Sequence, residues 1–319
     1  MSPAKAGERA YSRSNTSPLT LTSSFTSRAE PPERMCTTIA TVSFSFDPGV
    51  FAYLAIGVTL YVRAVRIARG RGLEVTTFQQ CAFYGGVALW AIAIFSPVHS
   101  LSEDLLSAHM AQHLLIAELG APFILVGLRA PVIYFFLPKP AMVWLAHRRT
   151  LRKVMRKLTT PLGAIATYAL VLYGWHFAPA FEAALHNPFV HALQHESFFL
   201  IAILVWIPAL EPTRRRLRGE LWKAGHIVGA RMTGMFLGMA FIAMRSPAYD
   251  WYVGRTEQHG LKPLEDQQIA GGLMVSLDVA IILFAVAFFF FRSGQDHDRA
   301  EAAQAETAAY GSTSPRRIA

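Results

Sequence analysis

The sequence has few charged residues and only two cysteines, and these shortages exclude several classes of protein. Charged residues make up 16% of the 319 residues, whereas a soluble domain carries roughly a quarter. Two cysteines are too few for a disulfide framework, and no Cys-x-x-Cys-His haem-attachment site is present. Walker, Rossmann and nucleophile-elbow motifs are also missing from any fitting context, as are nucleic-acid-binding modules. We therefore expect a protein that is not an enzyme and has no nucleic-acid partner.

Apolar residues are abundant instead, at 53% of the chain, and the mean hydropathy is positive. They form runs of roughly 18–24 residues, long enough to cross a hydrocarbon core of about 30 Å as helices. The composition therefore predicts an all-α, polytopic membrane helix bundle in a lipid bilayer, with about seven transmembrane helices. The expected spans are residues 49–67, 78–97, 104–127, 160–178, 189–210, 225–244 and 268–291.

Three further segments complete the predicted organisation, in which residues 47–292 form the membrane domain. Residues 1–46 are rich in Ser, Thr, Pro and Arg and are expected to be a disordered tail, with Met35 as an alternative start. Residues 130–147 are apolar but interrupted by Pro-Lys-Pro, so each half is too short to cross, and we expect an interfacial or re-entrant segment. Residues 293–319 are charged and are expected to be a disordered cytoplasmic tail.

Basic residues predict the orientation of the bundle. The loops after the first, third and fifth spans carry about seventeen Lys and Arg, whereas the other loops carry only Arg245, Arg255 and Lys262. By the positive-inside rule, the N-terminus lies outside and the C-terminus inside. The formal charge of +9 is then explained by cytoplasmic loops.

Histidines follow the opposite bias, because eight of the eleven lie at the predicted outer side. Two pairs have His-x-x-x-His spacing, His109 with His113 and His191 with His195. Residues four apart share one face of a helix. Histidine is rare within spans and usually faces the bundle interior or a polar cavity. Each pair is therefore predicted to point into the bundle, at similar depth.

Imidazole nitrogens are common metal ligands, and thioethers occur nearby. Combined imidazole and thioether ligation suits copper better than zinc, calcium or magnesium. We therefore predict an outer-leaflet copper site, with Cu(I) favoured, although packing or hydrogen bonding can also explain each residue alone. The candidate ligands from the residues themselves are His109, His113, His191, His195, His176 and Met110, followed by His99, His186 and Met239. Met235, Met244 and Met274 are further thioethers at membrane depth.

Three other polar residues lie within predicted spans. Glu118 and Arg231 are expected to form an ion pair or hydrogen bonds, because an isolated charge in the membrane is costly. Asp278 lies near the middle of the last span, where it either pairs in the same way or lines a polar path.

Three stretches together resemble a known family: SPVHSLSEDLLSAHMAQHLL with the APFILVG that follows, YGWHFAPAFEAALHNPFVHALQHESFFLIAILVWIPAL, and EDQQIAGGLM. They are similar to the multi-span CtaG-type cytochrome c oxidase assembly factors of bacteria, over about residues 50–291. The resemblance implies a multi-pass protein of the bacterial plasma membrane that helps to mature a haem–copper oxidase. Its implied partners are oxidase subunits or copper chaperones. It also implies His109, His113, His191 and His195 as the main site, with His176 and Asp266 next.

Alternative functions remain open at this point. A copper uptake or transport protein is close to the assembly interpretation, because family members lie beside copper-import modules. A redox carrier with haem bound between two histidines is another alternative. Haem needs one histidine from each side, however, whereas each His-x-x-x-His pair supplies two. A structural assembly scaffold would need none of the four histidines.

Overall fold

The computed structural model describes residues 48–213 and 219–313. The chain divides into two units, Met1–Thr41 and Val42–Ala319, and all the described residues belong to the second. The expected tail at residues 1–46 and the alternative start at Met35 lie outside the described residues.

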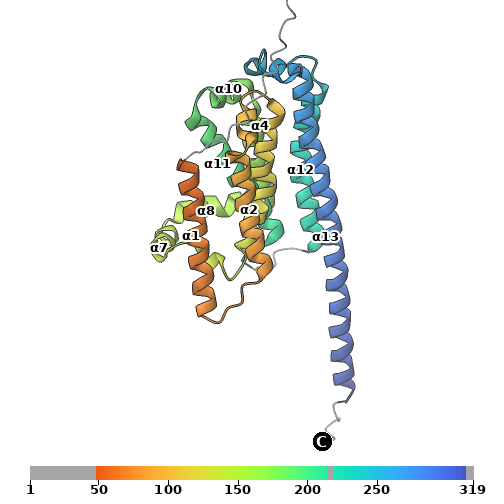
Figure 1. Cartoon of the computed structure of the whole chain (residues 1–319). Coiled ribbons are helices and arrows are strands. Elements are labelled where there is room, and N and C mark those ends of the chain that lie inside the picture. The colour runs from red at the N-terminus through yellow and green to blue at the C-terminus, as the bar shows by residue number, and fades with distance from the viewer. Residues whose placement is uncertain (1–47, 214–218, 314–319) are drawn as a thin grey trace, which may run out of the picture. The chain divides into compact units, whose positions relative to one another are not determined.

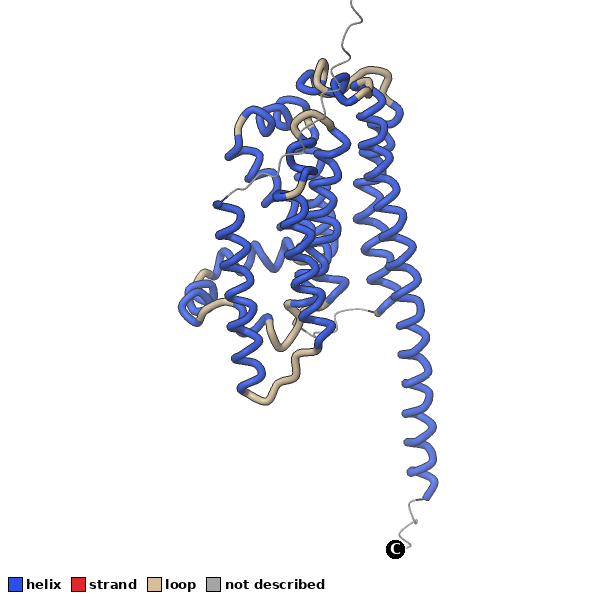
Figure 2. Tube along the Cα trace, viewed as in Figure 1, coloured by secondary structure: helices blue, strands red, loops and turns tan. Residues whose placement is uncertain are grey.

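Within the described ranges, every regular element is a helix (Figure 2). In the part of the chain that the structure describes, six helical segments are long and apolar enough to cross a membrane. They are α1 (Pro48–Gly70), α2 (Thr77–Phe95), the continuous segment Leu106–Gly127, α11 (Pro188–Leu210), α12 (Glu220–Ala243) and α13 (Pro263–Thr313). These segments confirm the predicted all-α membrane bundle.

The fourth predicted span corresponds to α9 (Pro161–His176), which has 16 residues. At 1.5 Å per residue this helix is about 24 Å long, shorter than a hydrocarbon core of about 30 Å. A total of seven crossings and the outward orientation of the N-terminus therefore stay predictions.

The interrupted apolar segment forms short helices. α6 (Ile133–Phe136) and α7 (Lys139–His147) are followed by the basic helix α8 (Arg149–Leu158). None of these helices is long enough to cross a bilayer. The Arg63 side chain of α1 donates hydrogen bonds to the carbonyls of Phe135 and Phe136, at 2.8 and 3.0 Å, which holds α6 against α1.

The C-terminal segment differs from the prediction. Residues from 293 onward were expected to be disordered, but α13 continues through them to Thr313. The segment is rich in Ala, Glu, Gln and Arg, which are strong helix formers. His297 also contacts Glu301 at 3.1 Å and Asp296 contacts Arg299 at 3.8 Å, spacings that support a helix. Helix propensity and these local pairs explain the difference.

Small residues allow the backbones of neighbouring helices to approach closely. α12 and α13 run side by side (Figure 1), and a Cβ on Gly238 would lie 2.8 Å from the carbonyl oxygen of Gly271. Such close approach of backbones is typical of small residues at membrane helix interfaces. The remaining elements are α3 (Pro97–Ser102), α4 (Leu106–His113), the π-helical turn η1 (Leu114–Gly120), α5 (Ala121–Gly127), α10 (Ala178–His186) and the 3-10 turns η2 (Asp250–Tyr252) and η3 (Thr256–His259).

Candidate metal site

The segment Leu106–Gly127 changes its helical pitch after His113. α4 places His109 and His113 on one face, and η1 then begins at Leu114. In a π-turn, residues five apart lie on one face, so Glu118 follows His113 on the same side. This pitch change brings an imidazole and a carboxyl group to one cavity, whose lining includes both His113 and Glu118.

Pro122 gives a local reason for the π-turn. Proline has no backbone N–H and cannot donate to the carbonyl four residues earlier. The adjacent Ala121 N–H donates to the carbonyl of Ile116, five residues back. π-turns occur frequently at functional sites.

Asp266 holds the beginning of α4 in place. Its carboxylate accepts a hydrogen bond from the backbone N–H of Leu106, at 2.6 Å, and others from the backbone N–H and hydroxyl of Ser107. A carboxylate satisfies the free N–H groups at a helix N-terminus and complements the helix dipole. Asp266 was expected as a lower-ranked metal ligand, but in the structure it positions the helix that carries His109 and His113.

α11 supplies the second histidine pair. It begins at Pro188 after Asn187, whose side chain accepts hydrogen bonds from the backbone N–H groups of Phe189 and Val190. This cap fixes the first turn of the helix, and His191 lies in that turn. His195 follows one turn later on the same face and is buried.

The two pairs face each other and form a closed group that we call the four-histidine cluster (His109, His113, His191 and His195). Within each pair, the ring centroids are 4.5 Å apart for His109 and His113 and 4.3 Å apart for His191 and His195. Between the helices, His109 lies 5.0 Å from His191 and His113 lies 4.9 Å from His195. Two imidazoles bound to one ion through bonds of about 2 Å have centroids within about 6 Å of each other. The four neighbouring pairs lie within this limit, whereas His113 and His191 are 6.5 Å apart and lie just beyond it.

Every imidazole of the cluster has a buried nitrogen with no hydrogen-bond partner. Both nitrogens of His109 and His113 are in this condition, as is Nε2 of His191 and His195. Buried polar atoms are usually satisfied, and an exception points to a function or to a bound water or ion. Across residues 48–213 and 219–313, however, no three His, Cys, Asp or Glu side chains are arranged so that they could hold a metal ion.

Two of the other candidate histidines border the cluster. His99, on α3, lies 6.4 Å from His191 between ring centroids, and its Nδ1 is 3.0 Å from Nε2 of Gln112. His176 ends α9, and its Nδ1 donates to the carbonyl of Leu172 at 2.7 Å, which leaves the buried Nε2 without a partner. By contrast, His186 is exposed and packs against Trp251, away from the cluster.

The candidate methionines likewise divide into those that are buried beside the histidines and one that is exposed. Met110 is 2% exposed and lines a cavity beside His113 and His176. Met274 lines the same cavity from α13 and is 5% exposed. Met239 is 50% exposed on α12, so the structure does not bring this predicted ligand to the site.

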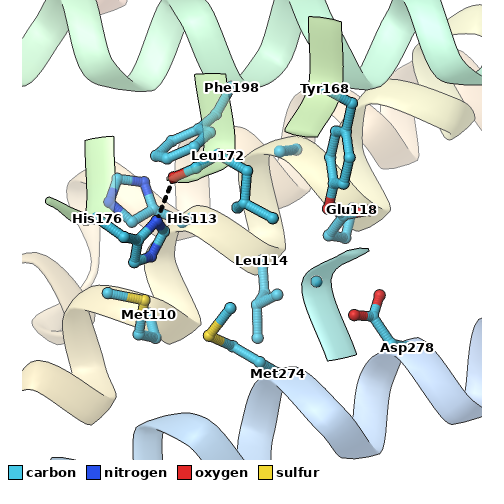
Figure 3. Close-up of a pocket in the computed structure, with 12 residues that line it drawn as sticks. Met110, His113, Leu114, Glu118, Tyr168, Leu172, His176, Phe198, Met274 and Asp278 are labelled. Carbon is cyan, nitrogen blue, oxygen red and sulfur yellow. Dashed lines mark hydrogen bonds between the residues drawn. The ribbon is translucent and has the colours of Figure 1, made fainter. Parts of the chain in front are cut away.

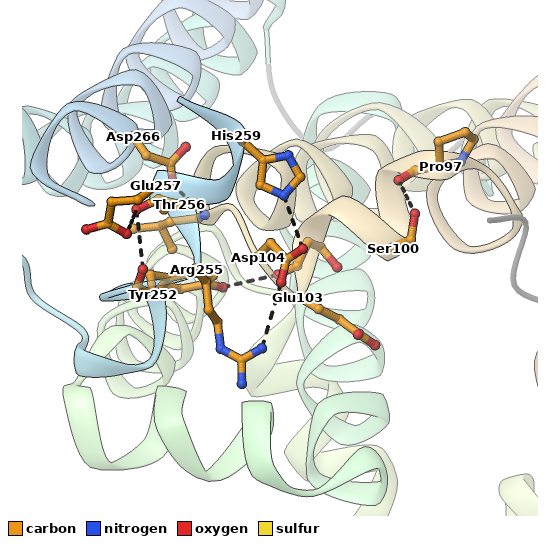
Figure 4. Close-up of polar contacts among 12 residues, drawn as sticks. Pro97, Ser100, Glu103, Asp104, Tyr252, Arg255, Thr256, Glu257, His259 and Asp266 are labelled. Carbon is orange, nitrogen blue, oxygen red and sulfur yellow. Dashed lines mark hydrogen bonds and ion pairs between the residues drawn. The ribbon is translucent and has the colours of Figure 1, made fainter. Parts of the chain in front are cut away.

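The last predicted outer loop is anchored to the helices that carry the site. The hydroxyl of Tyr249 donates to the carbonyl of His176 at 2.9 Å. Figure 4 shows Arg255 and His259 directed at Asp104, which lies just before α4, at 3.7 and 3.1 Å. Burial raises the pKa of Tyr249, so its hydroxyl stays neutral as a donor. The loop thus holds the ends of α4 and α9 together.

Three buried charged residues, Glu118, Arg231 and Asp278, form a second polar group that we call the ion cluster. Arg231 pairs with Glu118 and lies 3.3 Å from Asp278. The hydroxyl of Tyr168 donates to the other oxygen of Glu118 at 3.0 Å. Glu118 and Arg231 were each expected to form an ion pair or hydrogen bonds; the structure pairs them with each other, and Asp278 joins the pair.

Several residues that position the site were not singled out from the sequence. Gln112 links the α4 helix to the carbonyl of Ala93 on α2, at 3.0 Å. Gln267 accepts from the backbone N–H of Ala248 at 2.7 Å and donates to the carbonyl of Phe241 at 3.2 Å. Gln112 lies inside an apolar segment, where a polar side chain needs a partner, and that polarity marks it. Gln267 lies in the polar stretch EDQQ, just before the last predicted span, where its polarity gives no such signal.

Fold and site together define a multi-pass helical membrane protein with a buried group of imidazoles between two of its helices. The chain belongs to the cytochrome c oxidase caa3 assembly factor family (Caa3_CtaG), whose model matches residues 59–295. The match covers both histidine pairs and the ion cluster. Searches of curated proteins and of solved structures gave no match. The family assigns the chain to cytochrome c oxidase assembly.

Proposed function

We propose that this protein serves oxidase assembly in the bacterial plasma membrane by binding copper as cargo at the four-histidine cluster and passing it to an oxidase subunit or a copper chaperone. This role requires no catalysis by the protein. The observation that supports it is the set of buried imidazole nitrogens without partners on two facing helices. Each neutral imidazole offers one lone pair to a metal. Binding of one ion by all four rings would require rotation of the side chains, because the rings as placed do not form a metal-binding group.

The dimensions of the site favour an ion over a haem. Neighbouring rings of the cluster lie 4.3–5.0 Å apart between centroids, so they leave no gap for a porphyrin plane. Imidazole is a ligand that suits copper among other transition metals, and the buried thioether of Met110 lies beside His113 in the adjacent cavity.

The test is metal analysis of the protein purified in detergent after growth in copper. The variant replaces all four histidines of the cluster with leucine. A matched control replaces His147, His186 and His297, which are exposed, with leucine. Copper is expected in the wild type and the control, and only background copper in the four-histidine variant. Equal copper in all three proteins would reject the proposal.

Two further measurements separate the alternatives. Oxidase activity in cells that carry the four-histidine variant should fall if copper handling is the function, whereas full activity would indicate a scaffold. Copper uptake into cells or vesicles that is lost in the same variant would favour a transporter. A strong Soret band in the purified wild type would favour haem.

A further inference from the structure

A small cavity lies between the four-histidine cluster and the ion cluster. Its volume is about 30 Å³ and its wall comes from η1 and helices α4, α9, α11, α12 and α13 (Figure 3). Two imidazoles and two thioethers line it, from His113, His176, Met110 and Met274. These donors come from three different helices, so only the assembled bundle brings them together.

His176 is held in the orientation of a ligand. Its Nδ1–H donates to the carbonyl of Leu172 at 2.7 Å. This bond fixes the tautomer and leaves the lone pair on Nε2, which is buried and has no partner. Histidines that bind metals typically donate their other ring N–H to such a carbonyl. His113 lines the same cavity, and both of its ring nitrogens are without a partner.

The two thioethers give the cavity its chemical preference. Met110 and Met274 are almost completely buried and line the same space as both imidazoles. A thioether is a soft ligand that prefers Cu(I), whereas calcium, magnesium and manganese prefer oxygen. Of the oxygen atoms at the opposite end of the cavity, both of Glu118 accept hydrogen bonds, from Arg231 and from Tyr168, and Oδ1 of Asp278 accepts one from Arg231.

We propose that this cavity is a second copper position, which takes Cu(I) through His113, His176, Met110 and Met274. The proposal rests on the proposed function, since the ion would arrive from the four-histidine cluster. His113 belongs to both donor sets, so the ion can exchange one ligand at a time without leaving the protein. Each exchange replaces one copper–nitrogen bond with a bond to nitrogen or sulfur, and the oxidation state stays Cu(I).

The experiment uses the full chain in detergent, loaded with Cu(I) under anaerobic, reducing conditions. X-ray absorption at the copper edge is expected to show sulfur as well as nitrogen neighbours. The variant Met110→Leu/Met274→Leu should lose the sulfur signal and bind Cu(I) at least about tenfold more weakly in competition with a chelator. Loss of a residue that only hydrogen-bonds to a metal ligand typically lowers metal affinity about 10- to 100-fold. Loss of the ligands themselves should therefore lower it by at least about tenfold. The matched control is Met142→Leu/Met239→Leu, at exposed positions, and should behave as wild type.

Selenomethionine-labelled wild-type protein provides a measurement that does not depend on the variant folding. A copper neighbour at the selenium edge supports the proposal. Bound copper with only nitrogen neighbours, and no selenium–copper contact, overturns the second position but leaves the four-histidine site intact. No copper binding at all overturns the proposed function as well.

Discussion

The four-histidine cluster and the ion cluster are both buried in one helix bundle, but their polar atoms are bonded differently. In the ion cluster, both oxygens of Glu118 accept hydrogen bonds, and Arg231 also contacts Asp278. In the four-histidine cluster, each ring has a nitrogen with no partner, and Nε and Nη2 of Arg231 in the ion cluster also have none. Unsatisfied buried polar atoms cost free energy, on the order of 1–3 kcal/mol each. The ion cluster contains opposite charges that pair with one another, whereas the four-histidine cluster contains only imidazoles, on which the proposed copper site depends.

The two groups also lie close to each other along the chain. His113 precedes Glu118 by five residues, and η1 connects them. The cavity touches both groups. Glu118 and Asp278 of the ion cluster therefore line the same cavity as His113 of the four-histidine cluster (Figure 3).

The largest effect is expected from breaking the ion cluster. Replacing Arg231 with methionine leaves two buried carboxyl groups without their cation, and such a change typically costs about 3–5 kcal/mol. Thermal unfolding in detergent should show a large loss of stability. The control Arg255→Met removes a partly exposed pair at 3.7 Å and should cost less than about 1 kcal/mol. Similar unfolding temperatures for the two variants would contradict the assigned role of Arg231.

Copper should stabilise the folded protein through the four-histidine cluster. A ligand that binds only the folded state adds about 2.7 kcal/mol at a free concentration one hundred times its Kd. Cu(I) is therefore expected to raise the unfolding temperature of the wild type and of Arg255→Met, but not that of the four-histidine variant. An equal increase in the four-histidine variant would place the bound copper elsewhere.

Removal of the Asp266 carboxylate should have an intermediate effect on both stability and metal binding. Asp266→Ala leaves the N–H groups of Leu106 and Ser107 without their acceptor, and loss of a helix cap costs about 0.5–2 kcal/mol. Because α4 carries His109 and His113, Cu(I) binding should weaken as well. Asp266→Asn keeps an acceptor oxygen and should restore part of both losses. If Asp266 were a ligand, Ala and Asn would weaken copper binding equally.

The smallest effect on stability is expected within the four-histidine cluster itself. His113→Leu replaces two unpartnered nitrogens with an apolar side chain of similar size, which is often neutral or stabilising. The unfolding temperature of the metal-free variant should stay the same or rise, while copper binding falls. A loss comparable to that of Arg231→Met would show that His113 has a structural role.

Much of this arrangement could be predicted from the local pattern. The i,i+4 spacing places His109 with His113, and His191 with His195, on common faces whatever the neighbours are. Apolar runs likewise predict the long helices. The end of α13 was missed because its charged composition suggested disorder, whereas its helix propensity prevailed.

Residues with two plausible roles could not be resolved without the fold. Asp266 and Met239 both belonged to plausible donor types, but Asp266 caps α4 and Met239 is half exposed on α12. Met274 was one of several methionines in the sequence, and only the packing of α13 brings it to the cavity. Side-chain chemistry gives the possible roles, while the neighbours select among them.

The sequence alone determined the membrane class, the helical spans and the face that each histidine pair shares, because these depend on hydropathy and on 3.6-residue periodicity. Only the tertiary structure decided that α4 and α11 face each other, that Asp278 joins Arg231, and that two methionines border the imidazoles. Those contacts join residues far apart in the chain, and they depend on how whole helices pack. Periodicity within one helix contains no information about its neighbours.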